Sequence, residues 1–497
     1  MTIEENYQNN KFKFYNYINN IKKNIKVDIN YIINVTLIKN PYITEFPKKF
    51  FLKKKEEKGT SIYFLFIKNI FKFYLKQFYL FSTYIISFII FKVFYKKRRS
   101  MLKDFLLIDL FFLVDNIIKE KKFQENYFST LYNVLDKKNQ KYIFLSRLYG
   151  TNKNPFKLIK FFKIINQDKR EFLFEFELLS FQDLMEIFIM ILSYPFKTLQ
   201  LIQNDELFDR ELIKDIEKQS FEAFSRYIFG KNIAKLKEID RIYSWSEFQV
   251  IERSFNYGVR SKNSNIELIA CQFYLNYETY FNSYADDIDF DMYSSPHKIL
   301  VNGKYYIQNR DKVIYRLGVS LRYKDIFDFK GIEKEENILL LGSYVEQDTK
   351  YMLESLNDFN NILFKNHPAV DINRFGKLGS NINVVDKNIY ELFKNASLVI
   401  GTGSGTLVEA VACGLSVIII ASQGNLTANP LVKYGKGKIW DIAFNKDDIQ
   451  KLYNTLLKYR EENMDEIKEI ASWYRDNFFV EPTEENIIKA FELEKNI

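Results

Sequence analysis

The sequence of 497 residues contains little cysteine, histidine, glycine or proline. Its two cysteines, Cys271 and Cys413, exclude a scaffold held by disulfides and favour a reducing compartment. Its two histidines, His297 and His367, are too few for a metal site of three histidines. With only 17 glycines in the chain, a place where glycines gather is informative, and four of them fall within residues 401–414.

The composition is that of a folded chain with a modest basic excess. Apolar residues make up 47% and charged residues 27%, which excludes a disordered chain, and the length suits two or three domains. Lysine and arginine number 72 against 63 acidic residues, a net charge of +9. Lysine, phenylalanine and tyrosine share A/T-rich codons, which can account for this excess. The basic residues are spread along the chain without an RNA-binding aromatic motif, so we expect no nucleic-acid partner.

One stretch has the character of a membrane-associated segment. Residues 77–91 are uncharged, but a spanning helix needs about 20 apolar residues. Lysines precede this run and the basic cluster 96–99 follows it, which suits an interfacial helix beside an anionic leaflet. We predict peripheral membrane contact, with a spanning helix and a core helix as alternatives. The acidic start, Glu4 and Glu5, argues against a secretory signal, so the expected location is cytoplasmic, peripherally on the inner membrane.

The chain divides into five predicted segments. We expect a loosely attached polar arm or small helical extension, a hydrophobic and basic segment, two α/β lobes and a terminal helix, at residues 1–60, 61–100, 101–330, 331–480 and 481–497 respectively.

Strand and helix patterns alternate in both lobes. Apolar runs bounded by charges or turn residues predict strands in the first lobe at 105–115, 141–148, 239–245, 266–272, 298–303 and 313–321, with long amphipathic helices over 171–202. From Glu335 onward, continuously apolar strands alternate with helices at short intervals. This pattern predicts an α/β fold with parallel, doubly wound sheets. The acidic run 285–291 is interpreted as a solvated loop, and we expect no metal.

Residues 397–421, SLVIGTGSGTLVEAVACGLSVIIIA, carry the most informative pattern. An apolar strand runs into a glycine-rich turn, and a helix is expected to start at about Ser404. Glycines let the backbone approach a ligand, and free N–H groups at a helix start attract an anion. The P-loop lysine and the spacing of a dinucleotide fingerprint are absent. A plain strand-to-helix turn is the structural alternative to a phosphate site, whose expected residues are Thr402, Gly403, Ser404, Gly405 and Thr406.

Further side chains are expected at the same sheet edge. The segment ILFKNHP ends a predicted strand and thereby brings Lys365 and His367 beside the turn. His367 could donate a hydrogen bond to a phosphate and assist departure of the leaving group. Glu409, in the first turns of the following helix, could hold ribose hydroxyls, or it could stabilise the helix start.

The combination of NHP with GTGSGTLVEAVACGLSVI resembles the C-terminal lobe of GT-B glycosyltransferases of bacterial surface polysaccharide biosynthesis, and is similar to sialyltransferase- and Kdo-transferase-like enzymes. The resemblance covers about residues 235–480. It implies two Rossmann-like lobes facing a cleft, a nucleotide-sugar in the C-terminal lobe and an acceptor in the N-terminal lobe. It also implies that His367, Ser404, Gly405 and Thr406 contact the donor phosphate and that Glu409 lies near the ribose. It implies no metal or other cofactor.

The resemblance does not supply a catalytic base. The Glu-x7-Glu pattern of many retaining enzymes is absent, which favours an inverting reaction. Glu247 and Glu252 follow a predicted strand, and either carboxylate could take the proton of the acceptor hydroxyl. Ion pairing of these residues with Arg253 or Arg260 is the structural alternative.

We therefore expect an enzyme, a glycosyltransferase that moves a sugar from a nucleotide donor to a surface glycan, such as capsule or lipopolysaccharide, or to a lipid-linked acceptor. A CMP-linked acidic sugar is the first choice of donor. The alternatives are a UDP-sugar glycosyltransferase, a CDP-polyol phosphotransferase, a nucleotide-sugar epimerase and a non-enzymatic scaffold of polysaccharide assembly.

Overall fold

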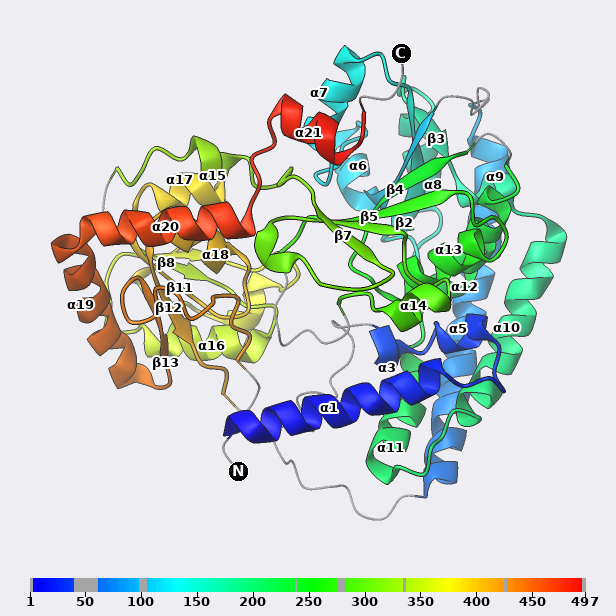
Figure 1. Cartoon of the computed structure of the whole chain (residues 1–497), viewed down its shortest axis with the longest axis horizontal. Coiled ribbons are helices and arrows are strands. Elements are labelled where there is room, and N and C mark those ends of the chain that lie inside the picture. The colour runs from blue at the N-terminus through cyan, green and yellow to red at the C-terminus, as the bar shows by residue number, and fades with distance from the viewer. Residues whose placement is uncertain are drawn as a thin grey trace.

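Two parallel β-sheets organise the chain, one in each lobe (Figure 1). The computed structural model describes residues 3–39, 61–97, 105–236, 239–275, 283–333, 337–423 and 427–493. The first sheet has seven strands in the order β3-β2-β1-β4-β5-β6-β7, and the second has six in the order β10-β9-β8-β11-β12-β13. Each strand pair in these sheets is parallel. The prediction of two α/β lobes with parallel, doubly wound sheets is confirmed.

The strands agree closely with the apolar runs of the sequence, because strands of a parallel sheet are covered on both faces. Only β3 and β13 lie outside the predicted strands. The bounds in the first lobe are β1 Leu106–Leu113, β2 Tyr142–Tyr149, β3 Glu171–Leu173, β4 Arg241–Trp245, β5 Glu267–Gln272, β6 Lys298–Val301 and β7 Ile314–Leu317. Those in the second lobe are β8 Asn337–Leu341, β9 Ile362–Lys365, β10 Ile382–Val384, β11 Ala396–Gly401, β12 Ser416–Ile420 and β13 Trp440–Ala443.

Helices connect the strands and cover the sheets. Before the first sheet lie α1 Ile3–Lys22, α2 Ile29–Ile32, α3 Thr36–Lys39 and α5 Ile62–Phe94. The first lobe contains α6 Val114–Glu120, α7 Ser129–Lys137, α8 Lys157–Ile165, α9 Glu175–Leu178, α10 Phe181–Leu199, α11 Glu206–Asp215, α12 Phe221–Ile233, α13 Val250–Arg260 and α14 Asp287–Asp291. The short helix α15 Asp325–Asp328 follows β7 in the chain and lies with the second lobe (Figure 1). The second contains α16 Glu346–Ser355, α17 Ile389–Phe393, α18 Thr406–Ala412, α19 Lys446–Glu462 and α20 Met464–Phe478, and α21 Glu484–Ala490 follows.

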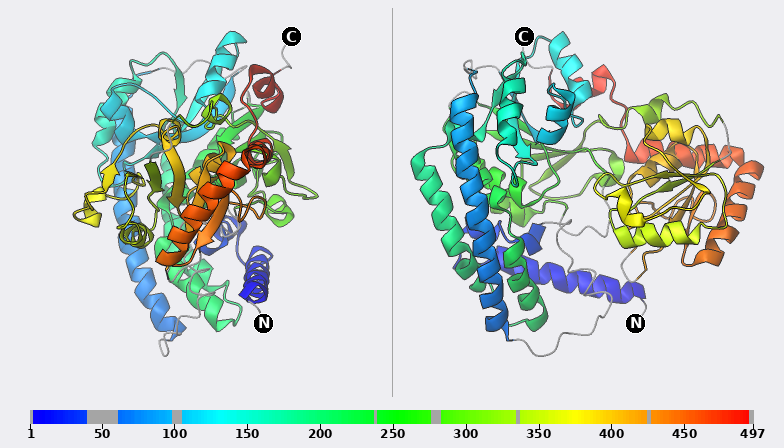
Figure 2. Two further views of the ribbon diagram at one scale, coloured as in Figure 1. Left: turned by 90° about the vertical axis from the view of Figure 1, so that its left-hand side faces the viewer. Right: turned by 180° about the vertical axis from the view of Figure 1, so that it is seen from behind.

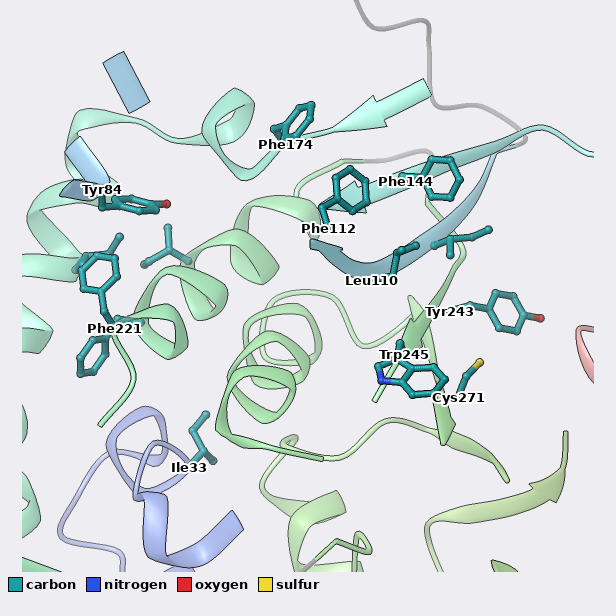
Figure 3. Close-up of a cluster of buried hydrophobic side chains, with 14 of the residues drawn as sticks. Ile33, Tyr84, Leu110, Phe112, Phe144, Phe174, Phe221, Tyr243, Trp245 and Cys271 are labelled. Carbon is teal, nitrogen blue, oxygen red and sulfur yellow. The ribbon is translucent and has the colours of Figure 1, made fainter. Parts of the chain in front are cut away.

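Aromatic side chains fill the core of the first lobe (Figure 3). The ring centroid of Phe112 on β1 lies 6.2 Å from that of Phe144 and 6.3 Å from that of Phe174. Trp245 and Cys271, at the ends of β4 and β5, are fully buried. The high aromatic content is thus used to build the core, since each large ring removes much apolar surface from water.

Of the two alternatives predicted for residues 1–60, the described part forms the helical extension and not a loosely attached arm. Phe14, Ile18 and Ile21 on α1 are buried in the core of the first lobe. The ammonium of Lys22 is also buried and pairs with the carboxylates of Asp286, at 2.6 Å, and Asp289, at 3.1 Å. The apolar spacing along α1 gives it a face that must be covered. Residues 40–60 lie outside the described residues.

The same ion pairs correct the interpretation of the acidic run 285–291. The run forms the short helix α14, whose start is capped by Asp286, and it is not a solvated loop. Asp289 is fully buried, and it pairs with Arg253 as well as with Lys22. Its carboxylate therefore ties the N-terminal helix to the first lobe.

Helix α5 begins at Ile62, well before the apolar run 77–91, and ends at Phe94, shortly after that run. It has 33 residues and is long and apolar enough to cross a membrane, yet only 28% of its most apolar stretch is buried. One face is held by the lobe, where the side-chain amides of Asn69 and Gln77 donate to the carbonyls of Ile213 and Gln219. Of the predicted basic cluster 96–99, positions 98 and 99 lie outside the described residues.

The C-terminal segment returns from the second lobe to the first (Figure 1). At the end of α20, the carbonyl of Phe478 accepts a hydrogen bond from the Asn302 side chain at 3.2 Å. The following helix α21 brings Phe491 into the core of the first lobe, and the Phe491 carbonyl accepts from Tyr243 Oη at 2.6 Å. The terminal helix thus packs on the lobe in which the chain began.

We predict that Gly303→Ala destabilises the packing of Phe478, at the end of α20, against the first lobe. A methyl group at Gly303 would lie 2.3 Å from the carbonyl carbon of Phe478, against backbone that has no freedom to rotate away. We expect the free energy of unfolding in urea to fall by about 2 kcal/mol. Gly437→Ala is the control, because Gly437 has a φ of +78° but open space around it, and should cost about 1 kcal/mol. An equal or larger loss for Gly437→Ala would contradict the packing argument.

Candidate functional site

The residues predicted to bind phosphate lie at the carboxyl edge of the second sheet. The order β10-β9-β8-β11-β12-β13 reverses its direction between β8 and β11. Ligands of open α/β sheets bind beyond the carboxyl ends of the strands at such a reversal. The turn 401–406 follows β11, Gly342 and Ser343 follow β8, and Asn366 and His367 follow β9. Three adjacent strands therefore bring these segments together.

Gly342 was not among the predicted site residues, although it directly follows an apolar strand. A side chain at this position would come within 2.9 Å of the backbone nitrogen of His367. Because glycine occupies the position, the segments that follow β8 and β9 can lie in direct contact. The signal was present in NILLLGS, but only the strand order shows that this strand lies between β9 and β11.

Backbone contacts fix the glycine turn. Gly403 has a φ of +61°, a left-handed conformation that glycine adopts without strain, and its N–H donates to the carbonyl of Ala428 at 3.0 Å. Ser404 Oγ accepts from the N–H of Thr406 at 3.3 Å. Helix α18 begins at Thr406 and not at the predicted Ser404. Ser404, Gly405 and Thr406 are half-buried, so a ligand can reach them.

Two polar oxygens at this edge are enclosed without a hydrogen-bond partner among the described residues. These are Thr402 Oγ1 and Asn366 Oδ1, and the Thr402 residue is only 2% exposed. The Asn366 amide nitrogen is used, since it donates to the carbonyl of Val370 at 2.7 Å. Buried polar atoms are normally hydrogen-bonded, so this edge has unused bonding capacity.

His367 is arranged as a neutral hydrogen-bond donor. Its Nδ1 accepts from the N–H of Ala369 at 3.2 Å, which assigns the ring proton to Nε2. Partial burial lowers the pKa of His367 below its ordinary value, so the ring is neutral at pH 7. The Tyr344 ring packs edge-on at a centroid distance of 5.8 Å. The free Nε2–H can therefore donate to an anion.

Two of the predicted donor-binding side chains are held by other groups. Lys365 Nζ donates to the carbonyl of Lys387 at 2.7 Å, on the side toward β10. Glu409 is 6% exposed, and its carboxylate accepts the hydroxyl proton of Tyr390. Burial raises the pKa of Glu409, and the nearby guanidinium of Arg322 partly offsets this. The structure thus does not bring Lys365 to the glycine turn.

The two lobes meet at the glycine turn. A Cβ atom added to Gly405 would lie 3.1 Å from Cβ of Leu275, which follows β5 of the first lobe. Nearby, the exposed guanidinium of Arg322 lies over the rings of Trp245 and Tyr127, with its carbon 5.3 and 5.8 Å from their centroids. Arg322 therefore places a positive charge near two groups, the aromatic end of β4 in the first lobe and Glu409 of α18 in the second.

Glu247 lies at the corresponding reversal of the first sheet, where the order β3-β2-β1-β4-β5 turns between β1 and β4. It follows β4 and is half-buried. Its carboxylate accepts from Trp245 Nε1 at 3.3 Å and from Gln249 Nε2 at 2.7 Å. Two neutral donors therefore hold this carboxylate in place at the end of β4.

Glu252 has a different environment. It is 3% exposed, pairs with the buried guanidinium of Arg147 and accepts from the backbone N–H of Gln249 at 2.8 Å, which caps α13. Burial raises its pKa to about 7, and Arg147 opposes that rise. Arg147 in turn lies 3.5 Å from Asp109. The partner of Glu252 is thus Arg147, which the sequence analysis did not consider, and not Arg253 or Arg260.

Among the described residues, neither a small cavity in the first lobe nor the acidic side chains provide an alternative catalytic or metal centre. The cavity holds about 50 Å³, room for a few waters, and is lined by side chains that include Tyr84, Glu175 and Glu222. Burial raises the pKa of Glu175 to about 7. No three His, Cys, Asp or Glu side chains of the described residues are grouped as a metal site requires.

No protein-family model and no curated protein sequence matches the chain. Solved structures match at low similarity. The glycotransferase of kitacinnamycin has 11% identity and a TM-score of 0.42, over 79% of this chain and 99% of that one. A UDP-GlcNAc 2-epimerase from Neisseria meningitidis bound to UDP-GlcNAc has 10% identity and a TM-score of 0.43, over 78% of this chain and 100% of that one. MurG of Acinetobacter baumannii has 11% identity and a TM-score of 0.41, over 78% of this chain and 99% of that one. Values this low carry no information on activity.

We predict that Glu252→Ala lowers the free energy of unfolding by about 3 kcal/mol, because the buried guanidinium of Arg147 loses a carboxylate partner. The measurement is chemical denaturation at pH 7. Glu120→Ala, at an exposed position of the same lobe, is the control and should change stability by less than about 0.5 kcal/mol. A loss at Glu252 no larger than that of the control would show that the ion pair contributes nothing.

Proposed function

We propose that the chain is a glycosyltransferase of GT-B type that transfers a sugar from a nucleotide donor to an acceptor hydroxyl. The observation that supports this most is the contact of Gly405 with Leu275, which brings the carboxyl edges of the two sheets together. One edge carries groups suited to phosphate and the other a carboxylate suited to accept a proton. A reaction between two substrates needs both at one place.

The donor phosphate would bind at the glycine turn. The hydroxyls of Ser404 and Thr406 and the unpartnered Thr402 Oγ1 are hydrogen-bonding groups of the right kind, and the glycines allow close backbone approach. The neutral His367 would donate through Nε2 to the phosphate and stabilise the leaving nucleotide. Glu409 bonds to the side chains of Tyr390 and Thr406, and it would exchange one of these contacts to reach a ribose hydroxyl.

These contacts recognise phosphate and do not select a base. We therefore propose the broader donor class, a sugar linked to a nucleoside mono- or diphosphate, in which UDP-sugars and the CMP-linked acidic sugars of the sequence analysis are separate candidates. The acceptor class we propose is a surface glycan or a lipid-linked glycan.

Glu247 is our candidate for the catalytic base, in preference to Glu252. Its carboxylate would take the proton of the acceptor hydroxyl as that oxygen attacks the anomeric carbon and the nucleotide leaves from the opposite face, which inverts the configuration. Arg322, between Trp245 and the turn, would bind an anionic part of either substrate. Glu252 supports this arrangement indirectly by capping α13 next to Glu247.

Donor binding tests the phosphate site. We predict that at least one of CMP, UDP, CDP and GDP binds, and that His367→Ala and Ser404→Ala each weaken that binding about tenfold, the loss of one hydrogen bond to a charged group. Titration calorimetry measures the affinities. Thr455→Ala, which removes an exposed hydroxyl from α19 of the same lobe, should leave them unchanged. Absence of binding by all four nucleotides would favour the scaffold and contradict the proposal.

Transfer activity tests the base. We predict that Glu247→Gln lowers sugar transfer at least 100-fold while nucleotide affinity stays within twofold, since a base acts on the chemical step. The assay follows nucleotide release from a labelled donor with and without lipid-linked glycan acceptors. Glu120→Gln should keep full activity. Full activity of Glu247→Gln would remove the assignment, and conversion of the donor alone to an isomer would identify an epimerase.

A further inference from the structure

Helix α5 presents a continuous apolar face to solvent. Ten of its large apolar side chains are exposed, among them Phe64, Ile67, Phe71, Leu75, Ile89 and Val93. Their spacing of three or four residues places them along one side of the helix. At 1.5 Å per residue this face is about 45 Å long. Soluble proteins seldom leave so long an apolar surface uncovered.

Helix α10 adds a second apolar stripe. Its exposed residues Phe181, Met185, Ile189, Leu192 and Phe196 again follow a helical spacing. The two helices account for more than half of the 29 large apolar side chains that are exposed in the described part of the chain. Most of the exposed large apolar side chains of the described residues are thus concentrated on α5 and α10.

The two helices lie side by side on the first lobe (Figure 2). Tyr74 Oη donates to the carbonyl of Leu192 at 2.7 Å. The rings of Phe66 and Phe196 lie 6.1 Å apart. The rings of Phe78 and Phe188 are also 6.1 Å apart. These contacts join the first half of α5, residues 66–78, to the second half of α10, residues 188–196, so the two stripes adjoin in one surface, called here the α5–α10 face.

The charges on α5 are of one sign, and the neighbouring Glu217 is paired with Lys72 of α5 at 2.8 Å. Helix α5 has four lysines and no acidic residue over its whole length, and Lys68 and Lys92 are exposed. On α10 the acidic residues do not contribute, because Asp183 is buried and Glu186 pairs with Lys231. Apolar side chains flanked by free ammonium groups are complementary to a bilayer that contains anionic lipid. A second copy of the same face would bring lysine against lysine.

Buried hydrogen bonds keep α5 attached to the lobe. The amides of Asn69 and Gln77 donate to backbone carbonyls at 3.2 and 2.9 Å, and Lys76 Nζ donates to the carbonyl of Gln219 at 3.0 Å. A helix that crossed the bilayer would have to break these bonds and bury Asn69 and Gln77 in lipid. The contacts of α5 with the lobe are therefore incompatible with a helix that crosses a bilayer, and they leave its opposite face open to a partner.

From these observations we infer that the α5–α10 face is a docking surface for an anionic bilayer. The face enters the interfacial region of one leaflet, while Lys68 and Lys92 contact lipid headgroups. This extends the peripheral contact predicted for residues 77–91 in two ways: the surface runs from Phe64 to Val93, and α10 supplies its second half. The inference does not depend on the proposed transferase activity.

Vesicle binding by the full chain tests the inference. Flotation with phosphatidylcholine vesicles that contain 30% phosphatidylglycerol, on the order of a bacterial anionic fraction, should recover most of the protein, with at least tenfold less on phosphatidylcholine alone. Leu75→Glu and Ile189→Glu, at exposed positions of the two helices, should each reduce binding at least tenfold. Phe444→Glu, at an exposed apolar position of the second lobe, is the matched control and should bind as the unchanged protein does.

Four outcomes would overturn the inference. Equal flotation of Leu75→Glu, Ile189→Glu and the control would place the contact elsewhere, and no flotation of the unchanged protein would exclude a bilayer partner. Membranes that retain the protein at pH 11 in carbonate would indicate a spanning helix. Dimers in lipid-free solution that both glutamate variants abolish would identify a second copy as the partner. Circular dichroism and nucleotide affinity of each variant separate loss of docking from loss of folding or of donor binding.

Discussion

The return of the chain from the second lobe to the first is the constraint on which the site depends. Phe478 passes so close to Gly303 that only a residue without a side chain fits. Because Ile487 of α21 and the following Phe491 are then buried in the first lobe, the two sheets are joined both by the segment between β7 and β8 and by this second crossing. Their carboxyl edges are thereby held together, with Gly405 against Leu275. A hinge between such lobes can open and close without separating them, as a site that must exclude water requires.

Much of this architecture could be predicted from the sequence. Continuously apolar runs such as those of β8 and β12 are typical of strands covered on both faces, and they gave the parallel sheets correctly. The glycine turn was recognisable because glycine is rare in this chain. The conformation of the turn depends on local chemistry, since the turn needs a left-handed residue and Gly403 adopts that conformation without strain. Local patterns were therefore sufficient for most of the strands and for the position of the glycine turn after β11.

What could not be predicted depends on contacts between distant residues. Glu252 and Glu247 stand five positions apart on one loop and helix. Glu252 is paired with Arg147, 105 residues away in the sequence, whereas Glu247 is half-buried and accepts from Trp245 and Gln249. The burial of Lys22 by Asp286 and Asp289 likewise joins segments that composition describes as a polar arm and a solvated loop. Periodicity also shows that α10 is amphipathic without showing whether its second side is covered.

The central claim is that a nucleotide phosphate binds where the segments after β8, β9 and β11 meet. Hydrogen exchange read by mass spectrometry, with and without the nucleotide that binds most tightly, tests this most directly because it needs no acceptor and no variant. The account predicts that protection concentrates in peptides covering 342–343, 366–367 and 401–406, with smaller effects near Leu275. Protection confined to the cavity beside Glu175, or distributed evenly over both lobes, would contradict it.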